Sequence, residues 1–198
     1  MGASLPVRRA PRNYTSTDHE TLGSDILAVV AAIRLPEQVL GTDMVQKLRT
    51  VKPDGWYPIS MLLDAMDRLF DRVGRFGLLQ MGRKLFEMSH AKKFKQVARS
   101  AGDLVYGIDG MYHFANRGNG IGGWQVAIFQ PGHAELVKTT PHHCVMEEGI
   151  VSEALRTLDI PSTVTQSLCM REGADYCRFV IRSPIVDEKW MGSRPAVP

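Results

Sequence analysis

The stretch Cys169-Met-Arg-Glu-Gly173-Ala-Asp-Tyr-Cys177 decides the fold of the last third of the chain. Its two cysteines lie four residues on either side of Gly173, in a segment that has the turn residues of a β-hairpin tip. An unbulged hairpin places such positions opposite each other, with Cβ atoms roughly 5 Å apart. The sequence therefore predicts two antiparallel strands that bring Cys169 and Cys177 together.

The chain has one other cysteine, Cys144, which precedes these two. It follows a Thr-Pro pair that indicates a helix start, and the first turn of a helix favours a thiolate. Three thiols brought together in this way could be metal ligands, a redox pair or packed core residues. Zinc would need a fourth ligand, for which His142, His143 and Gln166 are candidates, although the chain lacks the paired C-x-x-C knuckles of familiar zinc modules.

Helical patterns dominate the first part of the chain. Apolar residues recur at helical spacing from about residue 36 to 48, and most clearly from 59 to 73. Two further helices are predicted at 78–88 and 97–112. The apolar run 26–33 is compatible with either a buried strand or a buried helix.

The pattern changes after residue 115. Segments 124–129 and 134–138 alternate as strands around a Gln-Pro-Gly-His turn, and a helix is predicted from about 141 to 158 before the cysteine hairpin. The fold class is therefore α+β, an N-terminal helical bundle packed on a short antiparallel β-sheet with one interposed helix. Residues 1–22 are predicted to be a disordered tail, 23–183 a single ligand-binding-like domain and 184–198 a C-terminal tail.

The composition excludes several classes of partner. The formal net charge is only +3, and no segment combines clustered Lys and Arg with aromatic residues, so a nucleic-acid partner is not expected. The longest apolar run is too short to span a bilayer. An odd number of cysteines without a secretory signal indicates a reducing compartment, so we expect a cytoplasmic protein.

Catalytic and heme signals are weak in the sequence. No nucleophile elbow or zincin spacing is present, so an enzyme is not indicated. His113 and His90 are the candidates for a heme ligand, but no C-x-x-C-H attachment motif exists, and heme ranks below zinc. Gly102, Gly107 and Gly110 each cost a helix about 1 kcal/mol relative to Ala, so close packing or room for a ligand is expected to offset them.

The motifs Cys144-x4-Gly149 and C-x7-C-R-F, from Cys169 to Phe179, resemble the vinyl-reductase-type (4-vinyl-reductase-like) small-molecule-binding domain superfamily. That superfamily is related in fold to heme–nitric-oxide-binding domains. The segments 54–58 (Asp-Gly-Trp-Tyr-Pro) and 81–83 (Met-Gly-Arg) further resemble a bacterial, myxobacterial paralogous family of about this length. The resemblance covers roughly residues 25–183 and is most specific in the cysteine hairpin.

The resemblance implies a helical bundle on a short sheet, a small-molecule pocket and a homodimer. In its aromatic-sensing members, three Cys and one Glu hold zinc, which implies Cys144, Cys169 and Cys177 as metal ligands here. Gln166 stands at the position of the Glu. The heme–nitric-oxide branch uses a Tyr-x-Ser-x-Arg motif for the heme propionates, and this chain has none.

These observations predict a sensory domain that binds a small apolar or aromatic molecule and signals through a partner protein. The pocket is expected between the third helix and the sheet, because apolar pockets gain orientation from a few polar or aromatic groups. Its predicted ligand contacts are Leu104, Ile108, Met111, Tyr112, His113, Trp124 and Phe179. The alternatives are a ligand-free adaptor whose helices pack against a partner and, third, an enzyme acting on an apolar, tetrapyrrole-like substrate.

Overall fold

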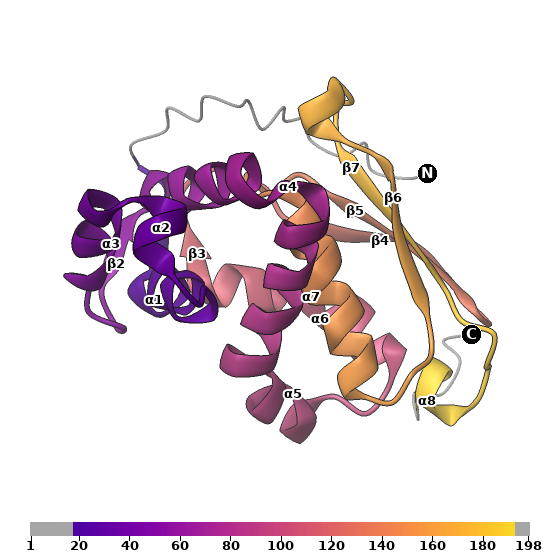
Figure 1. Cartoon of the computed structure of the whole chain (residues 1–198). Helices are drawn as coiled ribbons and strands as arrows, with labels where there is room; N and C mark the ends of the chain where they lie inside the picture. Colours follow the sequence, from indigo (N-terminus) through magenta and orange to yellow (C-terminus); the bar gives the residue numbers. More distant parts are fainter. Residues whose placement is uncertain (1–17, 193–198) are drawn as a thin grey trace.

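The computed structural model describes residues 18–192, and Figure 1 shows helices gathered on one side of a β-sheet. The fold is α+β, as the sequence predicts. The N-terminal part contains helices α1 (Gly23–Ala32), α2 (Pro36–Leu40) and α3 (Thr42–Arg49). The run 26–33 is therefore helical, and the single helix predicted at 36–48 is interrupted at Gly41, which has a φ of +86°.

The N-terminal part also contains a small antiparallel sheet that the sequence did not predict. It contains β2 (Trp56–Pro58), β1 (Glu20–Leu22) and β3 (Asn116–Arg117), in that order. These strands are two or three residues long, too short for alternation to be recognised. The described residues 18–22 are therefore part of the domain rather than of a tail, whereas residues 1–17 lie outside the described range.

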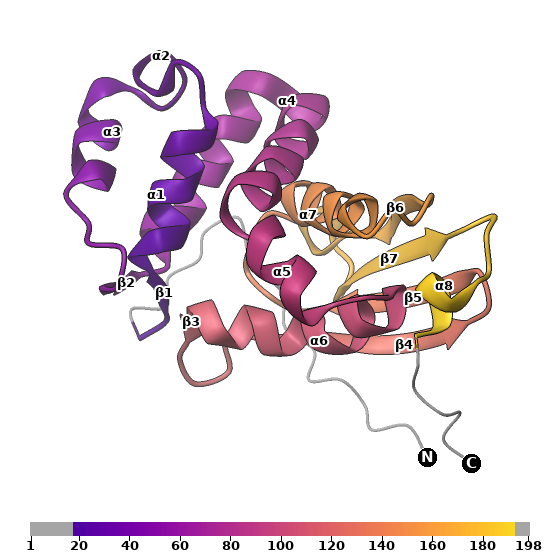
Figure 2. The same cartoon turned by 90° about the horizontal axis from the view of Figure 1, so that it is seen from below.

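The helices predicted at 59–73 and 78–88 form one element, α4 (Ser60–Ser89), bent at Gly74. Gly74 has a φ of +65°, which is favourable only for glycine. The bend lets the first half of α4 pack on α1 while the second half packs on α7 (Figure 2). The lysine-rich segment that follows is helix α5 (Ala91–Val97), which buries Phe94.

Helix α6 (Ala101–Ala115) begins with a reciprocal capping box, in which Ser100 and Asp103 bond each other's backbone N–H groups. It lies along strand β4 (Trp124–Gln130), the edge of a four-stranded antiparallel sheet. The other strands are β5 (His133–Lys138), β7 (Cys177–Arg182) and β6 (Thr163–Leu168), in spatial order β4-β5-β7-β6. Both predicted hairpins are confirmed.

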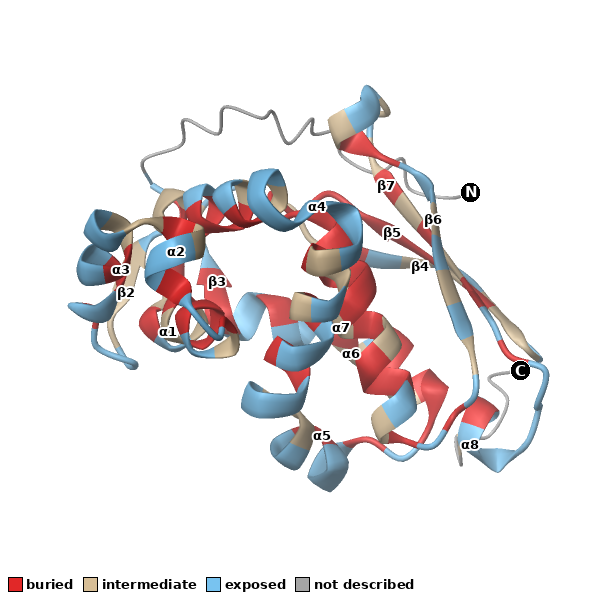
Figure 3. Cartoon of the chain, viewed as in Figure 1, coloured by how far each residue is buried: buried red, intermediate tan, exposed pale blue. Residues whose placement is uncertain are grey.

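Helix α7 (Cys144–Thr157) is the interposed helix, and Figure 3 shows it buried along most of its length. It packs against α4 and against β6. Two glycines bring α4 and α7 together: a Cβ on Gly82 would lie 2.0 Å from the Met146 carbonyl oxygen, and a Cβ on Gly149 2.2 Å from that of Leu79. No larger residue fits at either crossing position, so these glycines fix how α7 is seated.

The predicted C-terminal tail also needs correction. Helix α8 (Glu188–Met191) falls within it, and Trp190 is fully buried there, stacked on Phe129 with 5.9 Å between ring centroids. The indole N–H donates to the Gln130 carbonyl oxygen at 2.8 Å. A single aromatic residue anchors this segment, and no periodic pattern in the sequence marks it. Residues 193–198 lie outside the described range.

A buried three-thiol cluster

The three cysteines meet where α7, the cysteine hairpin and the end of β5 come together. Their sulfur atoms all lie within 4.8 Å of one another, and the Sγ atoms of Cys144 and Cys169 are 3.3 Å apart. All three are free thiols, and each is at most 8% exposed. The predicted convergence of the cysteines is confirmed.

Local structure explains how each sulfur reaches the cluster. Cys144 is the first residue of α7, and the His143 imidazole before it caps the helix by accepting from the Val145 N–H at 3.3 Å. The hairpin pairs Leu168 with Arg178, which is the register that sets Cys169 opposite Cys177. The irregularity in this hairpin lies farther along β6, between Gln166 and Leu168, and so leaves the cysteine end in register.

The surroundings of the cluster favour one thiolate and two neutral thiols. Hydrogen bonding from Cys177, together with His143, Lys138 and Gln166, lowers the pKa of Cys144 far below its usual range. The same hydrogen bond to Cys144, together with burial, raises the pKa of Cys177. Burial and the negative charge of the nearby Cys144 raise the pKa of Cys169. Gln166 thus lies where the sequence predicted, but its amide hydrogen-bonds to Cys144.

A buried ion pair that the sequence pattern does not predict lies beside the thiols. Lys138, 1% exposed and paired across the sheet with Cys177, donates to the His142 carbonyl oxygen at 2.6 Å and forms an ion pair with Glu147. The Glu147 carboxylate also accepts from the Thr140 hydroxyl at 2.9 Å. Burial lowers the pKa of Lys138, and the neighbouring cysteines oppose that shift.

Strand periodicity could have located Lys138. Ala134, Leu136 and Lys138 alternate along β5 and all face the core, so a residue two positions beyond Leu136 is expected to point inward. In the sequence, its partner Glu147 is most simply interpreted as an acidic residue that stabilises the first turn of a helix. Only the packing of α7 on the sheet shows that its carboxylate is buried.

His142 completes the polar part of the core. Burial and the positive charge of Lys138 lower its pKa to about 3, so the imidazole is neutral. Its Nδ1 lies 3.6 Å from Glu147 Oε1, and its Nε2 is buried without a hydrogen-bond partner among the described residues. The ring packs edge-on to Tyr112, with centroids 5.5 Å apart.

The predicted ligand contacts divide into buried and exposed positions. Five of them are buried in the α6–sheet region: Leu104, Ile108, Tyr112, Trp124 and Phe179. The other two face outward, because the Met111 side chain is 39% exposed and that of His113 46% exposed. The Trp124 and Phe179 rings contact each other with centroids 5.4 Å apart, so side chains occupy the space predicted for a ligand. Ligand binding by these residues stays a prediction.

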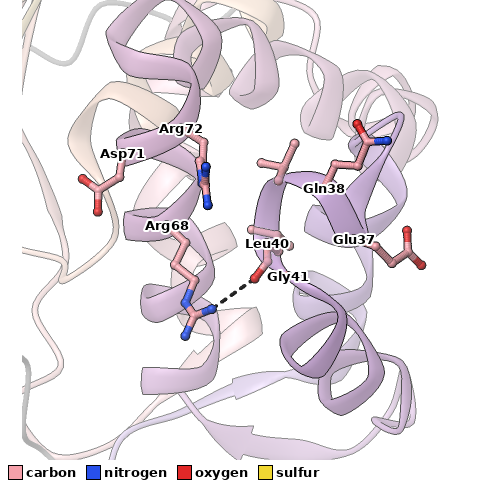
Figure 4. Close-up of a pocket in the computed structure, with 8 residues that line it drawn as sticks. Glu37, Gln38, Leu40, Gly41, Arg68, Asp71 and Arg72 are labelled. Carbon is pink, nitrogen blue, oxygen red and sulfur yellow. Dashed lines mark hydrogen bonds between the residues drawn. The ribbon is translucent and has the colours of Figure 1, made fainter.

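A surface recess of about 350 Å³ lies elsewhere, between α2 and the first half of α4 (Figure 4). Arg68 donates from Nη1 to the Leu40 carbonyl oxygen at 3.1 Å across it, which holds the α2–α3 turn against α4. Arg72 also lines the recess, as do the carboxylates of Glu37 and Asp71. The opposite charges balance, and we assign no ligand to this recess.

Solved structures share this arrangement of elements. An H-NOX protein from S. oneidensis in the Fe(II)NO ligation state aligns with a TM-score of 0.64 at 17% identity, over 82% of this chain and 99% of its own. An Fe(II) unliganded H-NOX protein from K. algicida aligns with a TM-score of 0.61 at 14% identity, over 83% and 97%. The chain has the H-NOX fold. No protein-family model matches the sequence, and no curated protein matches it.

The H-NOX fold confirms the predicted relation to heme–nitric-oxide-binding domains. The vinyl-reductase-type and myxobacterial resemblances stay predictions. The prediction that ranked zinc above heme is wrong for this fold, because the similar structures are described by iron ligation states and by a study of heme distortion in the H-NOX family. The zinc prediction rested on three converging thiols and on the resemblance to zinc-holding members of the vinyl-reductase-type superfamily.

Among residues 18–192, the side chains of His113, His142 and Lys138 do not provide a heme site. The exposed imidazole of His113 lies 3.5 Å from the Asp109 carboxylate, so it points away from the core. The buried imidazole of His142 is in contact with the Tyr112 ring. The buried cation, Lys138, is neutralised by Glu147 and is not free to bind a propionate. We therefore derive no chemistry from a heme.

Within residues 18–192, no helix combines the length and the hydropathy that a bilayer span requires.

Proposed function

We propose that this protein is a small-molecule sensory domain, that the three-thiol cluster is its sensing centre, and that its state is passed to a partner protein. The observation that carries the proposal is the 3.3 Å separation of two free thiol sulfurs in the core. The fold supports it, since H-NOX domains share it over more than four fifths of this chain. A thiol-reactive molecule would change the covalent structure of this core.

The small molecule is a peroxide in this proposal. The Cys144 thiolate attacks one peroxide oxygen, so that an S–O bond forms, the O–O bond breaks and the second oxygen leaves as water after taking up a proton. The Cys169 sulfur then attacks the Cys144 sulfenic acid; the S–S bond forms and the hydroxyl leaves as water with the Cys169 proton. Two thiols and one hydrogen peroxide give one disulfide and two water molecules.

Disulfide formation would move anchored elements. The sulfur separation has to shorten from 3.3 Å to roughly 2.05 Å, which draws the first residue of α7 towards the hairpin tip. The tip is tied to α4 by Arg171, whose guanidinium lies 2.7 Å from the Asp67 carboxylate. Helix α7 is tied to the same helix through Gly82 and Gly149. A change at the sulfur pair would therefore shift α4 through two contacts, the hairpin tip and α7. A partner protein would recognise the altered surface of α4.

Thiol counting tests the proposal. Reduced protein is titrated with hydrogen peroxide, denatured and assayed for free thiols, and the Cys144–Cys169 linkage is identified by peptide mass. The expected count falls from three thiols per chain to one. Cys177→Ser is the matched control, because it keeps the reactive pair and its hydroxyl can donate to Cys144 in place of the Cys177 thiol, so it should still lose two thiols. Cys144→Ser and Cys169→Ser should form no disulfide.

Hydrogen exchange tests the transmission step separately. Amides of α4 and α7 should change their exchange rates on oxidation of the wild-type chain and remain unchanged in Cys144→Ser. Survival of all three thiols in excess peroxide, or oxidation that never links Cys144 to Cys169, would contradict the sensing centre. Oxidation without any change in α4 exchange would contradict the route to a partner.

A further inference from the structure

The buried ammonium group of Lys138 has a hydrogen-bond donor that the internal ion pair does not use. An ammonium group has three N–H donors. Among residues 18–192, Lys138 has two acceptors, the His142 carbonyl oxygen at 2.6 Å and the Glu147 carboxylate. The side chain is 1% exposed, so bulk water does not reach it. The third N–H is therefore available to an acceptor that enters the core.

Strand pairing places this ammonium group beside the thiols. Lys138 lies opposite Cys177 in the ladder between β5 and β7. Opposite residues in a ladder have side chains on the same face, with Cβ atoms about 5 Å apart, and both of these side chains are buried. The Cys177 sulfur lies within 4.8 Å of the Cys144 sulfur. The unused donor and the nucleophilic sulfur thus belong to the same part of the core.

The proposed oxidation needs a proton donor in this part of the core. When the Cys144 thiolate attacks hydrogen peroxide, the electron pair of the O–O bond moves to the second oxygen. That oxygen would leave as hydroxide, a poor leaving group because its conjugate acid, water, has a pKa of about 16. The Cys169 and Cys177 thiols are weak acids, since their pKa values are raised. The pKa of Lys138 is lowered by burial, which makes its ammonium group the stronger acid.

We propose that Lys138 is the catalytic acid of the peroxide step and that its unused N–H binds the leaving oxygen. This inference rests on the proposed sensing function. As the S–O bond forms and the O–O bond breaks, one proton passes from the Lys138 nitrogen to the leaving oxygen, and water departs. The resulting amine regains a proton from solvent, which restores the ion pair with Glu147. The step therefore takes up one proton overall.

Two oxidants that differ in their leaving group test this role. Hydrogen peroxide needs a proton on the departing oxygen. Peracetic acid releases acetate, the stable anion of a carboxylic acid whose pKa is about 4. Both transfer an oxygen atom to the same thiolate, so a change in the amount of thiolate affects both rates equally. Loss of the proton donor should slow only the reaction with hydrogen peroxide.

The double variant Lys138→Met/Glu147→Gln removes the donor and remains foldable, because replacing both members of a buried ion pair costs less than removing one. Thiol loss is followed at pH 7 with each oxidant in excess. The rate with hydrogen peroxide should fall about 100-fold further than the rate with peracetic acid, as expected for loss of a general acid.

Two matched controls accompany the double variant. Glu147→Gln alone keeps the ammonium group, which the Cys144 thiolate still balances, so it should show no selective loss. Lys84→Met removes a surface lysine that pairs with Glu87 and should leave both rates unchanged.

A comparison with free cysteine needs no variant. Free cysteine in water has no positioned acid, so peracetic acid should react with it much faster than hydrogen peroxide does. In the wild-type chain, this preference for peracetic acid should be about 100-fold smaller.

Equal slowing of the two oxidants in the double variant would overturn the proposal, because Lys138 would then act only through the amount of thiolate. Unchanged rates in that variant would also overturn it, as would a wild-type preference equal to that of free cysteine. Each of these results is compatible with disulfide formation in the wild-type chain and so leaves the sensing function in place. Survival of the wild-type thiols in hydrogen peroxide would contradict the sensing function and the role of Lys138 together.

Discussion

Two pairs of helical glycines in this protein behave in opposite ways. Gly82 and Gly149 are required by the chain itself, because any Cβ there would collide with the backbone of the facing helix. Gly107 and Gly110 would meet nothing. The first pair seats the helix that delivers Cys144 to the thiol cluster, and the second pair leaves a bare stripe on the surface. A glycine inside a helix therefore indicates close approach, but only the structure shows whether the approach is internal.

Breaking the internal region should have the largest effect. Lys138→Met removes the cation that is paired with Glu147, so a buried carboxylate is left uncompensated, and the free energy of unfolding should fall by about 3–5 kcal/mol. Urea denaturation measures it. Lys84→Met is the control, since Lys84 pairs with Glu87 on the surface and should change stability by less than about 1 kcal/mol. If both variants lost the same free energy of unfolding, the Lys138–Glu147 pair would not be a buried ion pair.

The glycine comparison itself is tested by Gly149→Ala. The added methyl group would lie 2.2 Å from the Leu79 carbonyl oxygen, so α4 and α7 must separate, and we expect a loss of about 3 kcal/mol. Urea denaturation again gives the value. Separation of the helices should also displace Cys144, so disulfide formation with Cys169 should slow down. Unchanged stability would mean that the α4–α7 crossing is looser than described.

The pH dependence of stability provides a further test of the internal region. The pKa of His142 falls from 6.5 in the unfolded chain to about 3 in the folded one, because burial and Lys138 disfavour the charged imidazole. Its stabilising contribution is therefore complete above pH 6.5 and is lost as the pH falls towards 3. At pH 5 the loss is about 2 kcal/mol, even with Glu147 facing the ring. Urea midpoints at pH 7 and pH 5 measure this loss, and His142→Gln should reduce the difference. The remainder is expected from His90 and His143, because burial also lowers their pKa values.

The smallest expected effect has the opposite sign. Gly110→Ala adds a methyl group where the chain leaves open space, so the monomer should gain about 0.5–1 kcal/mol. Thermal unfolding of dilute, monomeric protein measures this gain. The same alanine substitution thus stabilises at Gly110 and destabilises at Gly149. A loss at Gly110 would show an internal role for that glycine.

Much of the fold could be predicted from the sequence because it is periodic. The amphipathic part of α4, the strands β4 and β5, and the register at Gly173 all follow from local patterns. The three-stranded sheet and α8 could not be predicted in this way. They depend on contacts between distant segments, such as Glu20 with Pro58 in the sheet and Trp190 with Gln130 for α8.

The site was predictable in its sulfurs but not in its charges. Spacing around Gly173 and the helix start before Cys144 brought the thiols together correctly. Glu147 gave no sign of burial, because an acidic residue in a first helical turn is most simply explained by the helix dipole. The preference for zinc came from the three thiols and from the resemblance to zinc-holding family members, and neither identifies the cofactor found in structures of similar fold. Met111 and His113 were expected in a pocket because their helix was clear but its rotation about its axis was not.

The ion pair beside the thiols also sets the electric charge of the core. With Lys138 and Glu147 balancing each other and His142 neutral, the Cys144 thiolate leaves this region with one net negative charge. A disulfide to Cys169 would remove that charge, because the reaction takes up one proton to release the second peroxide oxygen as water. The amino end of α7 would then lose the anion that its dipole faces. Oxidation of this protein would therefore change the electrostatic potential of its core as well as its shape.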